Sequence, residues 1–436
     1  MLFSSGNPYQ RLAREPILLG PQDFSCTISE RNLDAVDTMT DWAVIHFMAA
    51  DNNLAAALFD VVLELKKTGS NEQVHLCVFF DGPLLTDSFL ARLNPGASLE
   101  EDIFVRFGEL PTNRAAIMKE IIKNFIVIFP ANRRLLIFAG HGYGWRGLLP
   151  DENMCKTYLR TGQLQVTNDI TSLFRSNDSQ VRGVLQQIRN QIDPDARIEK
   201  SSIDIVLMNA CFMGNLEALA SLMGIATIII ASEDADIAET YDYNGMVRYL
   251  TEHPGTSPEQ MAGLLMNERR TTAPSGVLVP SHSAYAVSEI PDTLMMSATL
   301  AQALAAFLAE GGLSSINTAF ASTFHVSCRE FKDLKGIALN LLRESSLPSS
   351  LRNACEDIVV QCDKDRLILA TDAEGGRMSP NGISIYCPPP QRYQAGYRSY
   401  LEQNCPVLLP WQEFLMQWYA MLQRSCRESQ IAAIWG

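Results

Sequence analysis

The chain has 436 residues, long enough for one large α/β domain with elaborations or for two domains. Hydrophobic residues make up 47% of it and charged residues 19%, the balance of a globular rather than a disordered protein. The formal net charge of −14 argues against the basic surface of a nucleic-acid-binding protein and against a polybasic membrane anchor. We therefore expect neither nucleic acid nor membrane among its partners.

The location of the protein is predicted from its first residues and its cysteines. The first ten residues contain no basic region followed by an apolar core, so no signal peptide is expected. The apolar stretch 225–231 is too short to span a bilayer. The ten cysteines are scattered without Cys-x-x-Cys pairs, which indicates neither a zinc site nor a disulfide framework. The sequence thus predicts a cytoplasmic protein with mostly reduced, buried cysteines.

Strand and helix patterns alternate along the chain after an irregular N-terminal extension. In chain order, the first part predicts strand 42–49, helix 54–67, strand 74–81, helix 112–129 and strand 134–139. A polar interval over 151–200, with a helix at 180–191, leads to strand 203–210, helix 215–223 and strands 225–231 and 284–288. The last part is rich in helices, at 292–309, 332–343, 351–362 and 411–423, with one strand at 382–387.

Fully apolar strands that alternate with helices are typical of a mostly parallel sheet covered by helices on both faces. We therefore expect an α/β fold. Its predicted organisation is an N-terminal extension over residues 1–40, a core over 41–290, and a helix-rich region over 291–436 that completes the same unit.

A histidine and a cysteine each follow one of these apolar strands. His141 lies between two glycines after strand 134–139, and Cys211 follows strand 203–210. Chemistry in open α/β sheets collects beyond the carboxyl ends of the strands, so the fold can bring the two side chains together. The helix predicted after Cys211 favours its thiolate, and a thiolate with a histidine partner is the minimal set for cleaving an acyl bond. The pairing predicts a cysteine peptidase.

Each of these residues has a less specific interpretation when taken alone. A lone His-Gly is more often a solvated loop histidine, and a lone cysteine is more often a buried core residue. The other histidines have no comparable setting and are expected to be structural or at the surface: His46, His75, His253, His282 and His325. The Asp-Asn-Asn run at 51–53 is interpreted as a cap for helix 54–67. No nucleotide, dinucleotide or calcium motif is present, so no cofactor is expected.

Acidic residues gather at 233–242, after strand 225–231. Such a run is most often a solvated face. Beside a thiol site, an inward-facing carboxylate would instead pair with an arginine or lysine of a substrate. Glu233 and Asp234 are therefore candidate substrate-binding residues.

Five sets of residues, in order, make the chain resemble the clostripain family of caspase-like cysteine peptidases. They are 42–54, 138–145 around the histidine, 209–217 around the cysteine, 231–234, and a C-terminal set at 331–334, 382–386 and 411–415. The resemblance implies a caspase-like α/β/α sandwich and a catalytic dyad of His141 and Cys211. It also implies cleavage after arginine or lysine, with Glu239 where the family has the aspartate of its primary specificity pocket.

The chain departs from the family pattern near the substrate. Asn209 stands where the family commonly has an aspartate that contacts the substrate. A Pro-Gly-rich turn is replaced by Ala-Asp-Ile-Ala at 235–238, and Glu239 is longer than the usual aspartate. We therefore expect the dyad to follow the family more closely than the specificity does.

Activation is suggested by the resemblance alone. Some members cut themselves between the histidine and cysteine strands, and Lys156 and Arg160 in that interval resemble such sites. The other interpretation is that they are ordinary exposed basic residues. Calcium dependence occurs in the family, although no loop motif supports it here. Intracellular relatives act in bacterial phage defence after cleavage by an upstream protease, which implies a zymogen in a defence or signalling pathway.

The predicted reaction is hydrolysis of a polypeptide through a thioester on Cys211, with His141 moving the proton. The backbone N–H groups of Gly142 and Cys211 are candidates for the oxyanion hole. Two alternatives from other classes stay open. One is a catalytically inactive caspase-like scaffold or sensor, and the other is a thiol hydrolase acting on a small amide.

Overall fold

The computed structural model describes residues 39–84, 87–107, 118, 121–122, 125–126, 128–149, 203–238, 240–267 and 281–425. These residues form two compact units. The first unit contains the described residues within 1–210 and 237–270, and the second contains those within 211–236 and 271–436.

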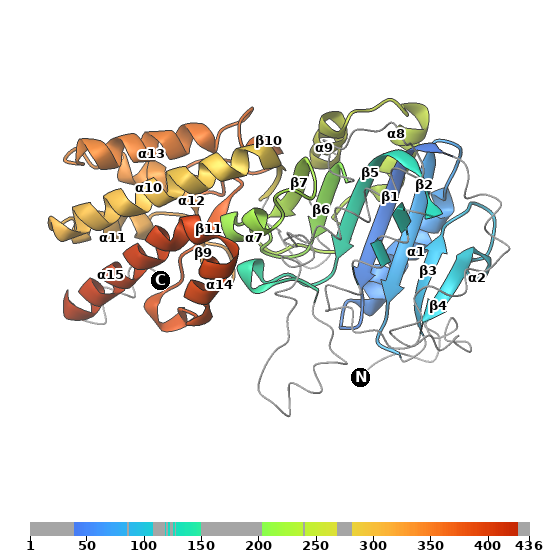
Figure 1. The fold of residues 1–436 in the computed structure, drawn as a ribbon, viewed down its shortest axis with the longest axis horizontal. Coiled ribbons are helices and arrows are strands. Elements are labelled where there is room, and N and C mark those ends of the chain that lie inside the picture. The colour runs from blue at the N-terminus through green and yellow to red at the C-terminus, as the bar shows by residue number, and fades with distance from the viewer. Residues whose placement is uncertain are drawn as a thin grey trace. The chain divides into compact units, whose positions relative to one another are not determined.

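The strands of the first unit lie in the order β6-β5-β1-β2-β3-β4. Their bounds are β1 Thr40–Ala49, β2 Val74–Asp81, β3 Ser88–Arg92, β4 Ile103–Phe107, β5 Ala131–Ala139 and β6 Ile205–Asn209. Strands β6, β5, β1 and β2 pair in parallel, whereas β3 and β4 extend the sheet antiparallel (Figure 1). The parallel strands are buried along nearly their whole length because their apolar runs fill both faces of the sheet.

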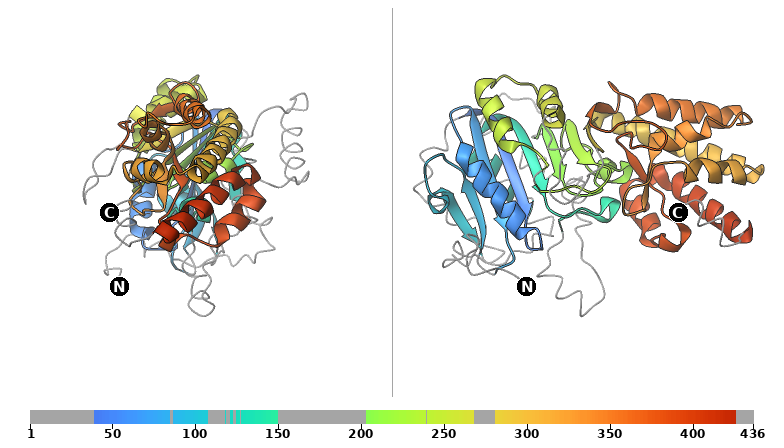
Figure 2. Two further views of the ribbon diagram at one scale, coloured as in Figure 1. Left: turned by 90° about the vertical axis from the view of Figure 1, so that its left-hand side faces the viewer. Right: turned by 180° about the vertical axis from the view of Figure 1, so that it is seen from behind.

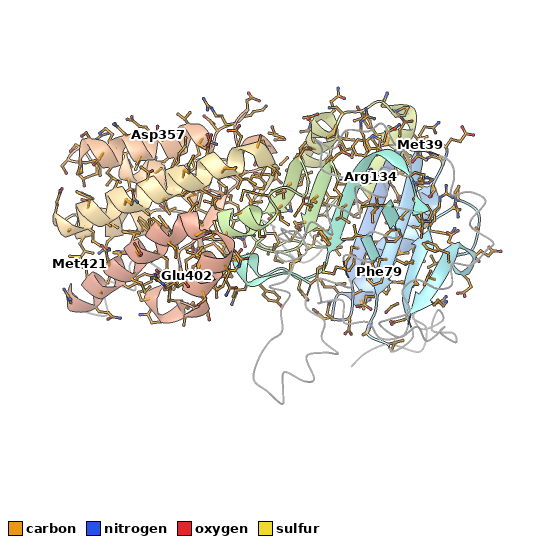
Figure 3. The ribbon with its side chains drawn as sticks, in the orientation of Figure 1. Met39, Phe79, Arg134, Asp357, Glu402 and Met421 are labelled. Carbon is orange, nitrogen blue, oxygen red and sulfur yellow. The ribbon has the colours of Figure 1, made fainter. Side chains whose placement is uncertain are left out.

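Helices cover this sheet. Their bounds are α1 Ala55–Thr68, α2 Leu99–Asp102, α8 Tyr243–Glu252 and α9 Pro258–Asn267, with a 3-10 turn η3 at Gly144–Arg146. Figure 2 shows α1, the blue helix in the right-hand view, lying on the face of the sheet alongside the strands. This helix buries Leu58, Val62 and Leu65 and contacts α8. Phe79 on β2 is fully buried in this core (Figure 3). The apolar residues of α1 therefore lie on one side of the helix and face the sheet, as the sequence predicts.

The second unit combines short strands with a set of helices. Strands β7 Ile228–Ser232, β8 His282–Ala286 and β10 Ile368–Thr371 pair antiparallel in the order β10-β8-β7, and β9 Phe331–Asp333 pairs with β11 Ser384–Tyr386. The helices are α7 Leu216–Ser221, α10 Ile290–Ala309, α11 Leu313–Ala321, α12 Leu334–Leu341, α13 Ser349–Gln361, α14 Gly396–Asn404 and α15 Leu409–Ser425. Three 3-10 turns complete it: η5 Val287–Glu289, η6 Pro390–Arg392 and η7 Pro406–Leu408.

Helix α10 is the central helix of the second unit. Together with η5 it spans Val287–Ala309, and among the described helices it is the one long and apolar enough to cross a membrane by length and composition. It packs against α13 and α15, and 44% of its most apolar window is buried inside the protein. The exposed polar side chains of Asp357 on α13 and Glu402 on α14 mark the outer side of these helices (Figure 3). Since the core helix of a soluble fold has the same features, α10 is weak evidence for a membrane span.

The predicted α/β fold with a mostly parallel central sheet is confirmed, and so is the helix-rich C-terminal part. One predicted helix starts too early: residues 331–333 form β9, and α12 begins only at Leu334. The reason is local, because the Asp333 side chain accepts the Gly336 N–H and so caps the helix from outside. The predicted helix 180–191 and most of helix 112–129 lie outside the described residues. The predicted boundaries at 40/41 and 290/291 stay predictions.

Glu217 in α7 is the buried anchor of the second unit. Its carboxylate is fully buried and accepts hydrogen bonds from the Tyr397 hydroxyl at 2.6 Å and the Tyr386 N–H at 2.9 Å. The Tyr400 hydroxyl donates to the Glu217 carbonyl at 3.0 Å. Burial raises the pKa of Glu217 to about 7, although the two hydrogen bonds to the carboxylate act in the opposite direction. This one residue ties α7 to β11 and α14.

Glu217→Gln is expected to make the protein's stability less dependent on pH. In the unfolded chain this carboxyl loses its proton near 4.5, whereas the folded protein keeps it to about 7. The stabilisation from the protonated form is therefore complete below the unfolded value and is lost as the pH rises through the folded value, about 3 kcal/mol in all. Glutamine stays neutral and keeps one oxygen as acceptor. Between about pH 4.5 and 8, the unfolding free energy of wild type should therefore fall by about 3 kcal/mol more than that of the variant, measured by urea denaturation.

The matched control is Glu356→Gln, at an exposed glutamate of α13. It should leave the pH dependence of unfolding as in wild type. Equal pH profiles for Glu217→Gln and wild type would contradict the prediction.

Candidate active site

His141 lies in a tight hairpin that follows β5 directly. The Leu149 N–H donates to the His141 carbonyl at 2.8 Å, and the Tyr143 N–H donates to the Gly147 carbonyl at 2.9 Å. The imidazole is half-buried. The hairpin therefore holds the backbone of His141 beyond the carboxyl end of β5, as the sequence predicts.

The His141 ring contacts Asn53, the last residue of the Asp-Asn-Asn run after β1. Nε2 of His141 lies 2.7 Å from Oδ1 of Asn53. Because an amide oxygen only accepts, this contact puts the proton on Nε2 and leaves Nδ1 as the basic nitrogen. The run was predicted to cap α1, but Leu54 is the N-cap residue and has no side-chain cap, while the Asn52 amide oxygen accepts the Leu54 N–H at 2.9 Å.

Cys211 follows β6 in a turn that is held by the residues after β7. The Phe212 N–H donates to the Asp234 carbonyl at 3.0 Å, and the Gly214 N–H donates to the Ser232 carbonyl at 2.6 Å. Phe212 has a left-handed backbone with φ of 61°, which is rare for a phenylalanine. The two hydrogen bonds offset the cost of this conformation and turn the chain sharply at Cys211.

The Cys211 sulfur is hydrogen-bonded to the backbone of Asp236. The Asp236 N–H donates to Sγ at 3.2 Å, and Sγ lies 3.6 Å from the Asp236 carbonyl. Burial raises the pKa of Cys211, the Asp236 N–H opposes this rise, and the charges of Asp236 and Asp234 add to it. The predicted helix after Cys211 is α7, which begins at Leu216 with Asn215 as its N-cap, and stabilisation of the thiolate by this helix stays a prediction.

Asn209 ends β6 and is buried. Its amide nitrogen donates to the Ala238 carbonyl at 2.9 Å and lies 3.0 Å from the Tyr243 hydroxyl. The side chain thereby ties the end of β6 to the segment that precedes α8. Its predicted contact with substrate stays a prediction. The predicted pocket acid Glu239 and the predicted cleavage sites Lys156 and Arg160 lie outside the described residues.

Glu233 and Asp234, predicted to bind substrate, make their contacts inside the second unit. Glu233 is fully buried, accepts the Gly382 N–H at 2.8 Å, and is hydrogen-bonded to Asp333. Burial and the charge of Asp333 raise the pKa of Glu233 well above its usual range. The Asp234 carboxylate accepts the N–H and the hydroxyl of Ser327. These bonds anchor the loop after β7.

Gly142 lies opposite Leu148 in the hairpin of His141. The hydrogen bonds of this hairpin use the N–H groups of the flanking residues Tyr143 and Leu149. The predicted oxyanion hole of Gly142 and Cys211 stays a prediction. Within the part of the chain that the structure describes, no three His, Cys, Asp or Glu side chains gather into a metal site.

Sequence reasoning missed the contact between Asn53 and His141. The signal was available: β1 and β5 are parallel neighbours in which Met48 pairs with Ala139, so the residues after both strands meet at one edge. The same argument that linked His141 to Cys211 applies to the Asp-Asn-Asn run.

Comparison with known proteins places the chain near one family. A model described as Peptidase_C11, clostripain family, matches residues 46–418. A comparison with curated proteins found no match.

Two solved structures have a similar fold. One is a secreted C11 cysteine protease from Bacteroides thetaiotaomicron in complex with an irreversible peptide inhibitor, 16% identical, with 85% of this chain and 99% of that chain covered and a TM-score of 0.54. The other is an inactive zymogen C11 protease from Parabacteroides distasonis, also 16% identical, with 87% and 99% covered and a TM-score of 0.54. At this identity the likeness establishes the shared fold.

The predicted cytoplasmic location is contradicted, because the structure from Bacteroides thetaiotaomicron is described as that of a secreted protease. The argument from scattered cysteines was weak for a physical reason. A chain of 436 residues can bury a large core, so it needs no disulfides for stability in any compartment.

Gly214→Ala is expected to destabilise the protein by about 1–3 kcal/mol through overpacking. A Cβ at Gly214 would lie 2.7 Å from each of three atoms: the backbone N of Glu233, the backbone C of Ser232 and the hydroxyl of Tyr285. Two of these atoms are backbone and cannot rotate away. Urea denaturation measures the loss. Gly255→Ala is the control, since a Cβ there meets nothing within 4 Å, and it should unfold as wild type does. Equal losses in both variants would contradict the prediction.

Proposed function

The chain belongs to the clostripain family of cysteine peptidases, and from this premise we propose that Cys211 and His141 form its catalytic dyad. Its activity class is that of a cysteine-type endopeptidase. The observation that carries the dyad is the register of the parallel pair β5 and β6, in which Ala139 lies opposite Asn209. His141 and Cys211 each follow two residues later, at the same edge of the sheet.

The proposed reaction is amide hydrolysis through a thioester. His141 takes the thiol proton on Nδ1, since Asn53 favours the proton on Nε2. The Cys211 sulfur attacks the carbonyl carbon, and the protonated His141 then gives its proton to the departing amine. Water hydrolyses the thioester with His141 again as the base. The backbone N–H groups of Gly142 and Cys211 are the proposed donors to the oxyanion, each worth about 3 kcal/mol in comparable sites.

Cleavage after arginine or lysine is the proposed specificity. Glu239 would supply the carboxylate that pairs with the basic side chain of the substrate. The hydrogen bond from Asn209 to the Ala238 carbonyl supports this, because it holds the residue next to Glu239 at the end of β6. The buried hydrogen bonds of Glu233 and Asp234 favour anchoring the loop over contact with substrate.

Activation by proteolysis is part of the proposal. The likeness to an inactive zymogen C11 protease supports a precursor form, with Lys156 and Arg160 as candidate cleavage sites for the enzyme itself or for an upstream protease. A role in bacterial defence was expected from the family resemblance together with a cytoplasmic location. Because that location is contradicted, the proposal does not include a defence pathway.

The first test uses matched fluorogenic peptides ending in Arg, Lys or Asp, with wild type and Cys211→Ala side by side. We expect wild type to cleave after Arg or Lys and Cys211→Ala to lose at least about 1,000-fold in kcat, because the nucleophile is gone. If intact wild type is silent, the assay is repeated after limited trypsin treatment. Equal turnover by Cys211→Ala would refute the dyad, and a trypsin-treated protein that is still silent would favour an inactive scaffold.

The contact between Asn53 and His141 gives a second test. Asn53→Leu removes the acceptor for Nε2–H, so the wrong tautomer of His141 becomes populated and kcat should fall about 10- to 100-fold with little change in KM. Asn53→Asp keeps an oxygen acceptor and is the matched control, which should retain most of the activity. Wild-type kcat in Asn53→Leu would show that the contact has no catalytic effect.

A further inference from the structure

The loop after β7 holds the turn of Cys211 by a row of backbone hydrogen bonds. Ser232, Asp234 and Asp236 each bond to a residue of 211–214, the first two through their carbonyls and Asp236 through its N–H to the sulfur. Every second residue from Ser232, the last residue of β7, to Asp236 makes one of these bonds, so the loop is held beside the turn of Cys211. Its position therefore decides where the sulfur lies.

Hydrogen bonds to residues outside this segment hold its successive residues in place. The Ser232 hydroxyl bonds to the Ser281 hydroxyl at 2.9 Å, and the Glu233 N–H donates to the Ser281 carbonyl at 3.0 Å. Asp234 accepts two hydrogen bonds from Ser327. These bonds secure the beginning of the loop, whereas Asp236, the residue that bonds the sulfur, lies at its far end.

The Asp236 side chain contacts the side chain of His282, the first residue of β8. Its Oδ2 lies 3.1 Å from Nε2 of His282, and both side chains are 1% exposed. The His282 backbone N–H in turn donates to Asp372 at 2.7 Å. Because both side chains are buried, loss of either one would leave the other buried without this polar contact. The contact therefore restrains the position of Asp236.

We propose that Asp236 and His282 are positioning residues for Cys211: their buried contact holds the Asp236 backbone N–H on the sulfur. The inference rests on the proposed role of Cys211 as nucleophile. The Asp236 backbone N–H thus acts on the reacting atom, while its carboxylate contacts His282 and its charge adds to the raised pKa of Cys211. The N–H donates to the sulfur and favours the thiolate, so it opposes the rise in the pKa of Cys211 that burial causes.

The test compares His282→Leu with His282→Gln. Leucine removes the partner of Asp236, whereas the glutamine amide can donate from near the position of Nε2. Two quantities are measured: kcat and KM on the best basic peptide, and the rate at which iodoacetamide alkylates Cys211, followed by mass spectrometry of its peptide. We expect His282→Leu to lower kcat and the alkylation rate about tenfold or more with KM little changed, and His282→Gln to stay within about threefold of wild type.

Asp236→Ala provides the second arm and keeps the test open if His282→Leu does not fold. It should lower kcat and the alkylation rate, but by less than His282→Leu, because it also removes a charge that raises the pKa of Cys211. The double variant should lose no more than His282→Leu, since both substitutions remove the same contact. Folded variants with wild-type rates, or equal losses in His282→Leu and His282→Gln, would overturn the inference. Turnover by Cys211→Ala would instead refute the proposed function, so the two failures are distinguishable.

Discussion

The parallel pairing of β5 with β6 is the constraint on which the candidate site depends. Strands in parallel register end at the same edge, and here Ala139 lies opposite Asn209. The two residues of the proposed dyad and the proposed partner of the histidine follow these strand ends or the neighbouring end of β1: His141 after β5, Cys211 after β6 and Asn53 after β1. A slip of the register would shift the ends of β5 and β6 relative to each other, and the apolar strands, buried on both faces, oppose such a slip.

Around Cys211, hydrogen bonds of the backbone hold the turn directly. The sulfur is bonded to the amide of Asp236, and the left-handed Phe212 is held by the carbonyl of Asp234. A backbone donor brings no side-chain entropy and no net charge into the site. The carboxylates of the same loop point into the second unit, so the acidic run serves the structure and the chemistry with different atoms of the same residues.

The second unit buries carboxyl groups to an extent that needs a physical account. Glu217 and Glu233 are both fully buried, and each accepts a backbone N–H from β11 or the residue Gly382 just before it. Burial raises the pKa of both groups, to about 7 for Glu217 and well above the usual range for Glu233, and so favours the protonated form. A protonated carboxyl is much cheaper to bury than an ion, which is why these acids can link α7 and the loop after β7 to the C-terminal strands.

The sequence by itself determined the α/β class, most strands and helices, and the two residues proposed as the dyad, because periodicity and strand ends are local signals in the chain. His141 and Cys211 stand out for this reason. Only the tertiary structure decided the contact between Asn53 and His141, the buried hydrogen bonds of Glu233 and Asp234, and the buried contact between Asp236 and His282. Residue 282 lies on a different strand from residue 236, and nothing in the local pattern of either segment specifies the other. Such pairs are set by packing between elements distant in the chain, where burial and hydrogen-bond geometry select the partner.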